Sequence, residues 1–188
     1  MSEPVHISSR DNPLLARLRK LTQDPGAYRK LGQVWLEGEH LCAALRARGH
    51  VAAHALVSES AWAAGGALHD LAASAAKVSV LSDALFKTLS ALESPARIGF
   101  LIEVPAADAI DAAAASVVLD RVQDAGNVGS ILRSAAAFGV KQVLALKGTA
   151  ALWSPKVLRA GMGAHFGLRL IEGLEPADLA ALAGASIR

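Results

Sequence analysis

One segment constrains the fold of this 188-residue chain more than any other, because it joins an apolar strand to a helix through a glycine-containing turn. Ser116–Asp120 (SVVLD) is a continuous apolar run, as expected for a parallel strand that is covered on both faces. Gly126 and Gly129 follow, and we expect them to let the backbone turn tightly. Apolar periodicity over residues 128–138 then predicts a helix that ends at Gly139. Strand, turn and helix in this order predict an α/β fold with parallel strands.

The polar residues around this turn predict a site. Asn127 is well suited as the N-cap of the helix, and the free N–H groups of a helix start bind phosphate or carboxylate. Asn127, Ser130 and Arg133 fall within two turns, on a face that looks back toward the turn. Apolar neighbours place Arg133 at the edge of the core, where it needs an anion; a salt bridge to Asp120 or Asp124 is the alternative. The residues expected to pack on the sheet are Ile131, Leu132, Ala135 and Phe138.

The first hundred residues also alternate between strand and helix. Cap-type residues and Pro13 precede leucines at three- and four-residue spacing, which predicts an amphipathic helix from Leu14 to Leu21. Further strands are predicted at 33–36, 55–57, 77–81 and 98–104, and helices at 39–48 and 82–89. The stretch 106–115 is rich in alanine and aspartate, which predicts a linker between a domain at 1–105 and a second domain at 116–188.

Charge is unevenly distributed along the chain. Residues 1–50 hold eight Lys or Arg against five Asp or Glu, residues 51–118 hold three against seven, and residues 119–188 hold eight against five. This division is compatible with a polyanion that contacts both ends of the chain, although ordinary solvated helix faces would look the same. The candidate nucleic-acid contacts are Arg10, Arg17, Arg19 and Lys20 on the first helix, and Lys156 and Arg159 further on.

Several classes of protein are disfavoured. No apolar run reaches the roughly 20 residues of a membrane span, and the start of the chain lacks the order of a signal peptide, so we expect a soluble cytoplasmic protein without a membrane partner. The single Cys42 cannot form an intramolecular disulfide, and no Cys/His cluster has zinc-ligand spacing, so we expect no metal. The spacing of Gly126 and Gly129 also departs from the dinucleotide-binding G-x-G-x-x-G pattern.

Read together, residues 127–135 (NVGSILRSA), with Phe138 and Gly139, resemble the first signature motif of the SpoU/TrmH family of RNA 2'-O-ribose methyltransferases. That motif is N-x-G-[AS]-[IL]-x-R-[ST]-A after an apolar strand. Residues 154–166 are similar to the segment that follows it in the family. Residues 8–12 and 34–38 are similar to the family's substrate-binding domain.

The resemblance implies a small ribosomal-protein-like α/β substrate-binding domain followed by an incomplete α/β trefoil-knot methyltransferase domain. It implies S-adenosylmethionine as cofactor, ribosomal or transfer RNA as substrate, and a homodimer in the full-length form. Asn127 and Arg133 match the functional positions of the motif, with Arg133 near the target ribose and its phosphate, and Ser130 is a further candidate RNA contact. Because a free arginine has a pKa above about 12, orienting the phosphate suits Arg133 better than taking a proton.

The sequence departs from the family in one respect. The family has two further motifs, a Gly-rich loop with a glutamate and a Ser-Leu-Asn segment, which build the cofactor pocket, and neither is found here. No cofactor-binding residue can therefore be named. We expect a truncated chain, with residues 1–188 alone neither binding S-adenosylmethionine nor methylating RNA. A non-catalytic RNA-binding module is the alternative.

Overall fold

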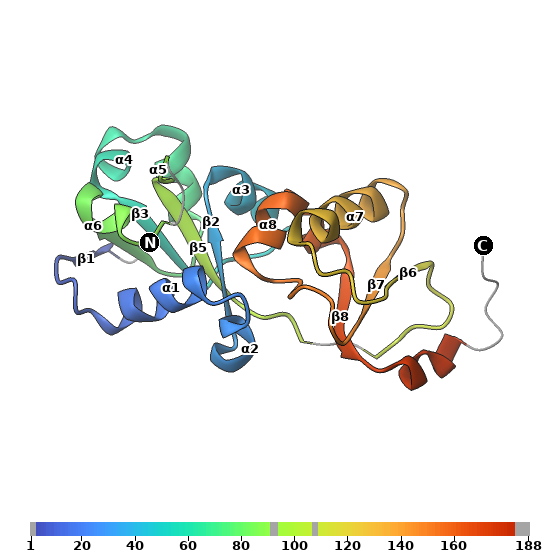
Figure 1. Cartoon of the computed structure of the whole chain (residues 1–188). Coiled ribbons are helices and arrows are strands. Elements are labelled where there is room, and N and C mark those ends of the chain that lie inside the picture. The colour runs from blue at the N-terminus through green and yellow to red at the C-terminus, as the bar shows by residue number, and fades with distance from the viewer. Residues whose placement is uncertain (1–2, 91–93, 107–108, 183–188) are drawn as a thin grey trace. The chain divides into compact units, whose positions relative to one another are not determined.

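The chain folds into two compact units, Met1–Val104 and Pro105–Arg188, in the computed structural model (Figure 1). The structure describes residues 3–90, 94–106 and 109–182. The sequence analysis ended the first domain at residue 105, one residue later. Both units combine β-sheet with helices, which is the α/β class expected.

The first unit contains a five-stranded sheet in the order β1-β4-β3-β5-β2. β1, β4 and β3 run parallel, whereas β5 is antiparallel to both of its neighbours, β3 and β2. Buried apolar side chains line β3 and β5, as central strands require. The strand bounds are β1 Val5–Ile7, β2 Gln33–Glu37, β3 His54–Ser58, β4 Val78–Leu81 and β5 Ile98–Glu103.

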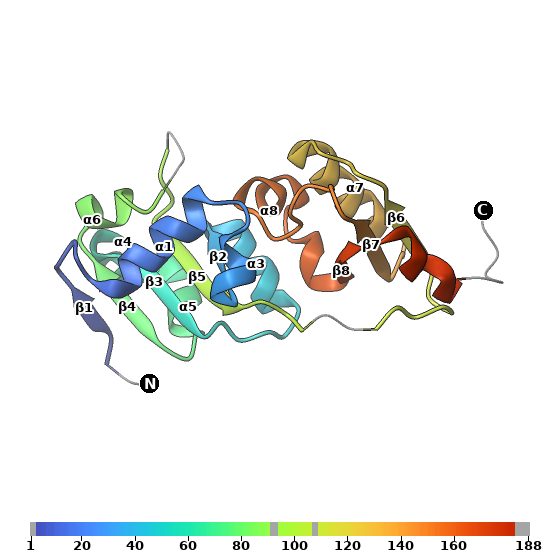
Figure 2. The same cartoon turned by 60° about the horizontal axis from the view of Figure 1, so that its bottom comes forward.

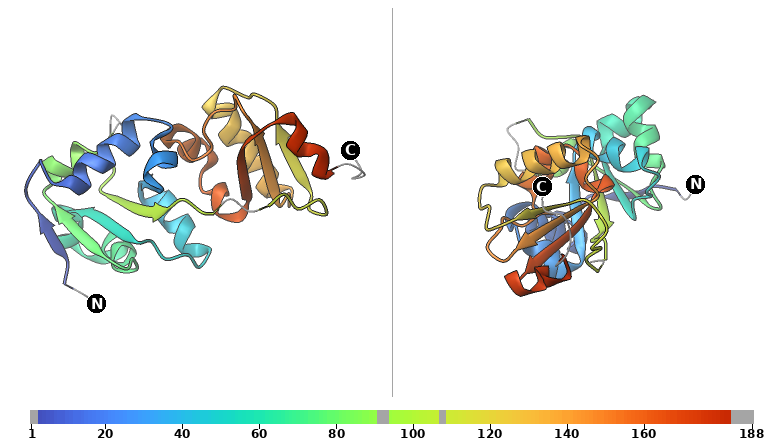
Figure 3. Two further views of the ribbon diagram at one scale, coloured as in Figure 1. Left: turned by 90° about the horizontal axis from the view of Figure 1, so that it is seen from below. Right: turned by 90° about the vertical axis from the view of Figure 1, so that its right-hand side faces the viewer.

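Helices cover both faces of this sheet, with α1 on one face and α3 and α5 on the other (Figures 2 and 3). α1 begins as predicted: the Asn12 side chain accepts a hydrogen bond from the Leu14 N–H. Leu15, Leu18 and Leu21 form its buried stripe. The helix bounds are α1 Pro13–Gln23, α2 Ala27–Leu31, α3 Glu39–Ala47, α4 Glu59–Ala64, α5 Gly66–Ala73 and α6 Asp83–Lys87.

The second unit is built on three parallel strands in the order β6-β7-β8. α7 and α8 pack against each other on one face of this sheet (Figures 1 and 3). Such βαβ crossovers are what parallel neighbours require. The bounds are β6 Ser116–Leu119, α7 Ala125–Ala137, β7 Gln142–Leu146, α8 Pro155–Gly161, η1 Ala164–Gly167, β8 Arg169–Leu174 and η2 Pro176–Leu182.

The strand at 116–119 is parallel, as predicted, but it is not covered on both faces. β6 lies at the edge of the sheet, where Val117 is half-buried and Val118 is 40% exposed. β7 is the fully buried strand, because it has a neighbour on each side. An apolar run predicts burial but cannot say which of three parallel strands lies in the middle.

The linker predicted over residues 106–115 is bound to the second unit from Asp111 onward. The buried Gln142 side chain accepts a hydrogen bond from the Asp111 N–H (3.0 Å) and donates to the Asp111 carbonyl (2.9 Å) and to Ser116 Oγ (2.7 Å). These bonds hold the chain from Asp111 onward against the start of β7. Within the described residues, no helix is long and apolar enough to cross a membrane.

Candidate functional site

The carboxyl edge of the β6-β7-β8 sheet is the candidate site, because ligands of open α/β sheets bind beyond the carboxyl ends of the strands. Two loops meet there. Thr149 Oγ1 donates to the Leu119 carbonyl (3.1 Å), and the Ala150 N–H donates to the Val122 carbonyl (2.9 Å). The loops that follow β6 and β7 are therefore held together by hydrogen bonds that cross between them.

The loop between β7 and α8 is also tied to the segments that follow it. The Leu152 N–H donates to Glu172 Oε1 in β8 (2.7 Å), and the Leu152 carbonyl lies 2.9 Å from His165 Nε2. Lys147 forms an ion pair with Glu175 at the surface. The backbone of this loop is thus preorganised without a ligand.

His165 is a packed residue of the second unit. Its side chain is 1% exposed and lies beside Trp153, with ring centroids 5.2 Å apart. Burial lowers the pKa of His165 to about 4, so the ring is neutral at pH 7 and its Nε2 donates to the Leu152 carbonyl. Among the described residues, its Nδ1 has no hydrogen-bond partner. Trp35 and Trp153 are buried as well, which favours core packing over stacking on bases.

Asn127 is not the N-cap of α7, contrary to the prediction. The helix begins at Ala125, and the Asp124 carboxylate is the cap, accepting a hydrogen bond from the Asn127 N–H at 2.7 Å. Asn127 is therefore the third residue of the helix, and its exposed side chain is free of a capping role.

The capping of α7 by Asp124 also argues against the anion site predicted at the start of this helix. A helix start attracts anions through its unpaired N–H groups and its positive dipole end. Here the Asp124 carboxylate already supplies the negative charge and accepts one of those N–H groups. A phosphate at the same place would face like-charge repulsion, so the start of α7 is a poor phosphate site.

Gly129 has a packing role rather than the turning role predicted for it. It lies in the second turn of α7, where α7 meets α8. A Cβ on Gly129 would lie 2.3 Å from the Ala160 Cβ and 2.7 Å from the Gly161 nitrogen. The two helix backbones can approach this closely only because Gly129 has no side chain.

Arg133 is exposed, so the prediction that it lies at the edge of the core is wrong. Its alternative partners are engaged elsewhere: Asp120 pairs with Arg121, and Asp124 caps α7. In the part of the chain that the structure describes, Arg133 has neither a hydrogen bond nor an ion pair. Phe138, which was expected to pack on the sheet, is 87% exposed. An exposed arginine without a partner keeps all of its donors for an external anion.

The structure brings Asn127, Ser130 and Arg133 together as exposed residues at three-residue spacing on α7. Lys156 is exposed on α8, and Arg159 is half-buried there. Because the helices pack against each other, these five candidates share one helical layer of the second unit. Their roles as RNA contacts remain predictions.

The other candidate RNA contacts lie in the first unit. Arg17 donates to Gln33 Oε1 (3.1 Å), and Arg19 donates to the Arg10 carbonyl (3.1 Å). Lys20 is exposed on the same helix, α1. These hydrogen bonds hold the Arg17 and Arg19 side chains in place. Neither guanidinium is paired with a carboxylate among the described residues, so each can still bind a phosphate.

Arg121 is a charged residue at the carboxyl edge of the β6-β7-β8 sheet and was not among the predicted site residues. This exposed residue lies directly beyond β6, has φ 54° and binds the Asp120 carboxylate through two hydrogen bonds of 2.6 and 2.9 Å. The guanidinium lowers the pKa of that carboxyl. A Cβ on Gly148 would lie 3.0 Å from Arg121 Cγ, so the following loop packs on this side chain. The sequence feature that could have predicted Arg121 is its position directly after an apolar parallel strand, where ligands of α/β sheets bind.

The described residues do not offer an evident cofactor or metal site. They contain no group of three His, Cys, Asp or Glu side chains that could hold a metal ion. A hollow of about 440 Å³ lies at the opposite, amino edge of the sheet, lined by Asp111, Lys141, Gln142 and Arg169. One carboxylate and two cations do not match an adenine ring or a sulfonium group.

Comparison with known proteins assigns the second unit. Residues 114–185 match the model of the SpoU rRNA Methylase family. The second unit belongs to the SpoU methylase family. The chain is also similar to human mitochondrial rRNA methyltransferase 3, with 54% identity over 59 residues, which are 31% of this chain and 14% of that protein. An uncharacterized tRNA/rRNA methyltransferase of Synechocystis sp. is 33% identical over 165 residues, covering 86% of this chain and 60% of the relative.

Solved structures agree on the fold. An AdoMet-bound rRNA methyltransferase from Sinorhizobium meliloti superposes with a TM-score of 0.78 at 22% identity, covering 96% of this chain and 68% of that one. An RNA 2'-O ribose methyltransferase gives 0.70 at 26% identity, covering 96% and 70%. The chain thus spans 14% and 60% of the two relatives and about two thirds of the two structures.

In the SpoU unit, the signature motif occupies α7 rather than a turn before it. Its glycine, Gly129, fits the helix against α8, while its Asn127 and Arg133 face outward. One motif therefore combines a packing residue with two exposed polar residues.

Proposed function

We propose that this protein transfers a methyl group from S-adenosylmethionine to a ribose 2'-OH of ribosomal or transfer RNA. The observation that carries the proposal is the match of residues 114–185 to the SpoU family. The ribose as target is supported by the likeness to an RNA 2'-O ribose methyltransferase. S-adenosylmethionine (AdoMet) as methyl donor is supported by the structural similarity to the AdoMet-bound rRNA methyltransferase from Sinorhizobium meliloti.

Arg133 would bind the phosphate next to the target ribose. A guanidinium offers five N–H donors in a planar fork and no acceptor, so orienting the phosphate suits Arg133 better than taking the 2'-OH proton. It can instead stabilise the negative charge that develops on the 2'-oxygen. Because Arg133 is exposed and unpaired among the described residues, it needs to break no internal ion pair to do so. Asn127, released from the capping role, would hold the ribose by hydrogen bonds.

The described residues give no set of side chains to which S-adenosylmethionine can be assigned. We expect residues 1–188 alone to bind no cofactor, since the Gly-rich and Ser-Leu-Asn motifs do not occur in them. Calorimetry that detects micromolar S-adenosylmethionine binding by this chain would contradict that expectation.

The test of the function is a comparison of 2'-O-methyl sites in total RNA from cells with and without the intact gene. We expect one or a few sites to disappear and to return with the wild-type gene. A gene carrying Arg133→Lys should restore methylation roughly 100-fold less efficiently, because lysine lacks the planar, two-donor geometry. Arg46→Lys, an exposed residue of α3, is the matched control and should restore it fully.

Two other outcomes are informative. Loss of a methylated base instead of a methylated ribose would contradict the 2'-OH as target. RNA binding with unchanged methylation patterns would favour the non-catalytic RNA-binding module.

We further propose that the full-length protein is a homodimer that acts in the cytoplasm. Phe138 and Met162, 87% and 57% exposed, are two large apolar side chains of the SpoU unit that such an interface would bury. Sedimentation of the full-length protein tests the dimer, and cell fractionation tests the location.

A further inference from the structure

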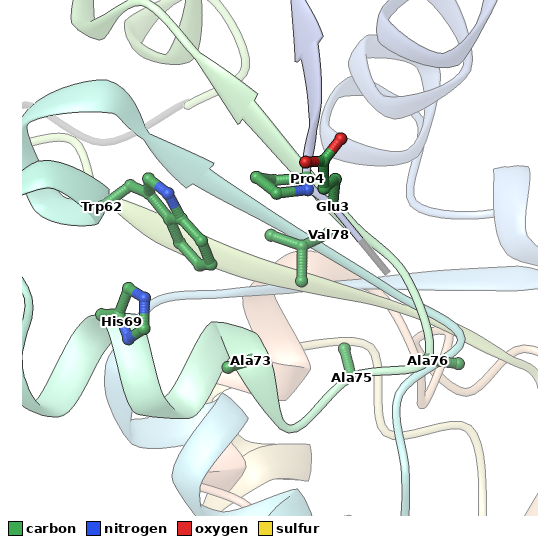
Figure 4. Close-up of a pocket in the computed structure, with 8 residues that line it drawn as sticks. All are labelled: Glu3, Pro4, Trp62, His69, Ala73, Ala75, Ala76 and Val78. Carbon is green, nitrogen blue, oxygen red and sulfur yellow. The ribbon is translucent and has the colours of Figure 1, made fainter. Parts of the chain in front are cut away.

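The first unit contains a pocket that lies apart from α1 and its arginines. It has a volume of about 240 Å³ and is formed by the start of β1, the start of β4 and the helices α4 and α5. Figure 4 shows Trp62 and His69 on one side, with Pro4 and Val78 across from them. The residues that line it are Glu3, Pro4, Trp62, His69, Ala73, Ala75, Ala76 and Val78.

The aromatic wall of this pocket is preformed. The Trp62 and His69 rings stack with centroids 4.2 Å apart, and His69 Nδ1 lies 3.2 Å from Asp70 Oδ1. Trp62 is half-buried, whereas Trp35 and Trp153 are buried in the cores of their units. The opposite side is made of small side chains, which leave room beside the indole (Figure 4). A flat or elongated group can therefore enter.

Charge decides which group suits this pocket. Glu3 is the charged residue among its lining residues. From Gly49 to Ala76 the sequence contains Glu59 and Asp70 but no lysine or arginine. Lys77 is the nearest cation along the chain and is exposed beside the pocket. Because Glu3 lines the pocket whereas Lys77 lies outside it, the lining itself favours a cation over a phosphate group.

We propose that this pocket binds the side chain of an arginine presented by a basic protein partner. The guanidinium would lie against the Trp62 indole and pair with the Glu3 carboxylate. Cations are attracted to the face of an indole ring, and arginine is the side chain that most often makes such contacts. The alkyl part of the arginine would cover Val78 and the alanines, as long cationic side chains do on apolar surfaces. This site is independent of RNA methylation.

The test is a titration of the 188-residue chain with two peptides, followed by NMR at the Trp62 indole N–H, which Trp62→Phe identifies. The peptides are acetyl-Gly-Arg-Gly-amide and the same peptide with citrulline, which has nearly the shape of arginine but no charge. We expect saturable shifts with a millimolar-range Kd for the arginine peptide and at least threefold weaker binding for citrulline. Glu3→Gln should weaken arginine binding about threefold, while Glu59→Gln, outside the pocket, should not.

Three results would overturn the proposal. Equal binding of both peptides would mean that the pocket recognises shape without charge. Stronger shifts with adenosine monophosphate than with the arginine peptide would mean a nucleotide site instead. Unchanged Trp62 signals with arginine peptide at tens of millimolar would mean that the pocket does not take this side chain.

Discussion

At the scale of single residues, the sequence assigned two roles to Asn127, helix capping and RNA contact. In the structure Asp124 has the capping role, and the RNA contact remains proposed for Asn127. Both are good N-cap residues, and both stand before apolar positions, so the sequence alone cannot choose between them. In the structure Asp124 caps the helix, which then starts one turn earlier and brings Val128 into the buried stripe. Asn127 becomes an exposed helical residue whose amide is available for other partners.

Substitution separates these two roles. Asp124→Ala should lower the free energy of unfolding of the SpoU unit by about 1 kcal/mol, because the Asn127 N–H loses its partner. Asn127→Ala should leave stability within about 0.5 kcal/mol, yet lower methylation when it is introduced into the full-length protein. Denaturant unfolding and a methylation assay are the measurements. The proposed roles are wrong if the alanine at 127 destabilises more than the alanine at 124.

His165 makes stability depend on pH. Its pKa is about 4 in the folded protein because of burial, below the 6.5 of an exposed histidine. The unfolded chain therefore takes up a proton before the folded chain does, and stability falls as pH drops from about 6.5 to 4. It changes little above 6.5, where both states are neutral. The slope approaches 1.4 kcal/mol per pH unit within this window.

The measurement is hydrogen exchange of the second unit between pH 7 and 4.5, corrected for intrinsic rates. His165→Gln keeps a nitrogen that can donate to the Leu152 carbonyl and does not titrate, so the pH dependence should flatten even if overall stability falls. A comparison within the second unit matters, because burial also lowers the pKa of His54 in the first unit. An unchanged slope in the glutamine variant would exclude His165 as the cause.

At the scale of elements, the sequence predicted what local patterns encode and missed what depends on distant neighbours. The leucines of α1 and the alternation around β2 and β5 are local, and these elements are confirmed. β1 was missed, because it is only three residues long and is made a strand by pairing with β4, over 70 residues later. α4 and α5 are short and rich in alanine and glycine, so they carry little periodicity.

The candidate site shows the same division. The motif located Asn127, Ser130 and Arg133 on one helix, because their spacing is local. It could not reveal that Arg121 binds Asp120, nor that Arg121 has a left-handed backbone conformation, which non-glycine residues seldom adopt. Nor could it reveal that Gly129 meets Ala160, because the approach of two helices is a tertiary property.

Gly129→Ala tests the close approach of α7 and α8. Alanine gains about 1 kcal/mol in helix propensity over glycine, but its methyl group would lie 2.3 Å from the Ala160 Cβ. Forcing two packed helices apart typically costs about 1–3 kcal/mol, and a contact this short falls at the upper end, so the cost exceeds the gain and we expect net destabilisation. Gly126→Ala, in the same helix, would meet only the Asp124 side chain, at 3.1 Å, and should change stability by less than about 1 kcal/mol. Thermal unfolding of both variants decides whether the glycine is needed for packing.

At the scale of the whole molecule, charge distinguishes the regions of the chain. Residues 1–50 carry an excess of cations, several of them on α1, whereas residues 51–118 carry an excess of acids. Both belong largely to the first unit, so its charge is unevenly distributed along the sequence. RNA suits the cations of α1, whereas the basic partner inferred for the Trp62 pocket suits the Glu3 carboxylate. The two proposals thus depend on different charged side chains of one small domain.

The RNA-binding role of α1 can be measured through salt. Each phosphate contact that is lost should reduce the slope of log Kd against log salt by about 0.7–0.9. Lys20 is exposed and has no ion pair among the described residues, so Lys20→Gln should weaken RNA binding and lower the slope without a change in stability. Arg48→Gln removes the same charge at the end of α3, which lies on the opposite face of the sheet, and should leave the slope unchanged (Figure 3). Equal slope changes in both variants would mean that RNA binding depends only on the net charge of the unit. The proposal that RNA contacts α1 would then be wrong.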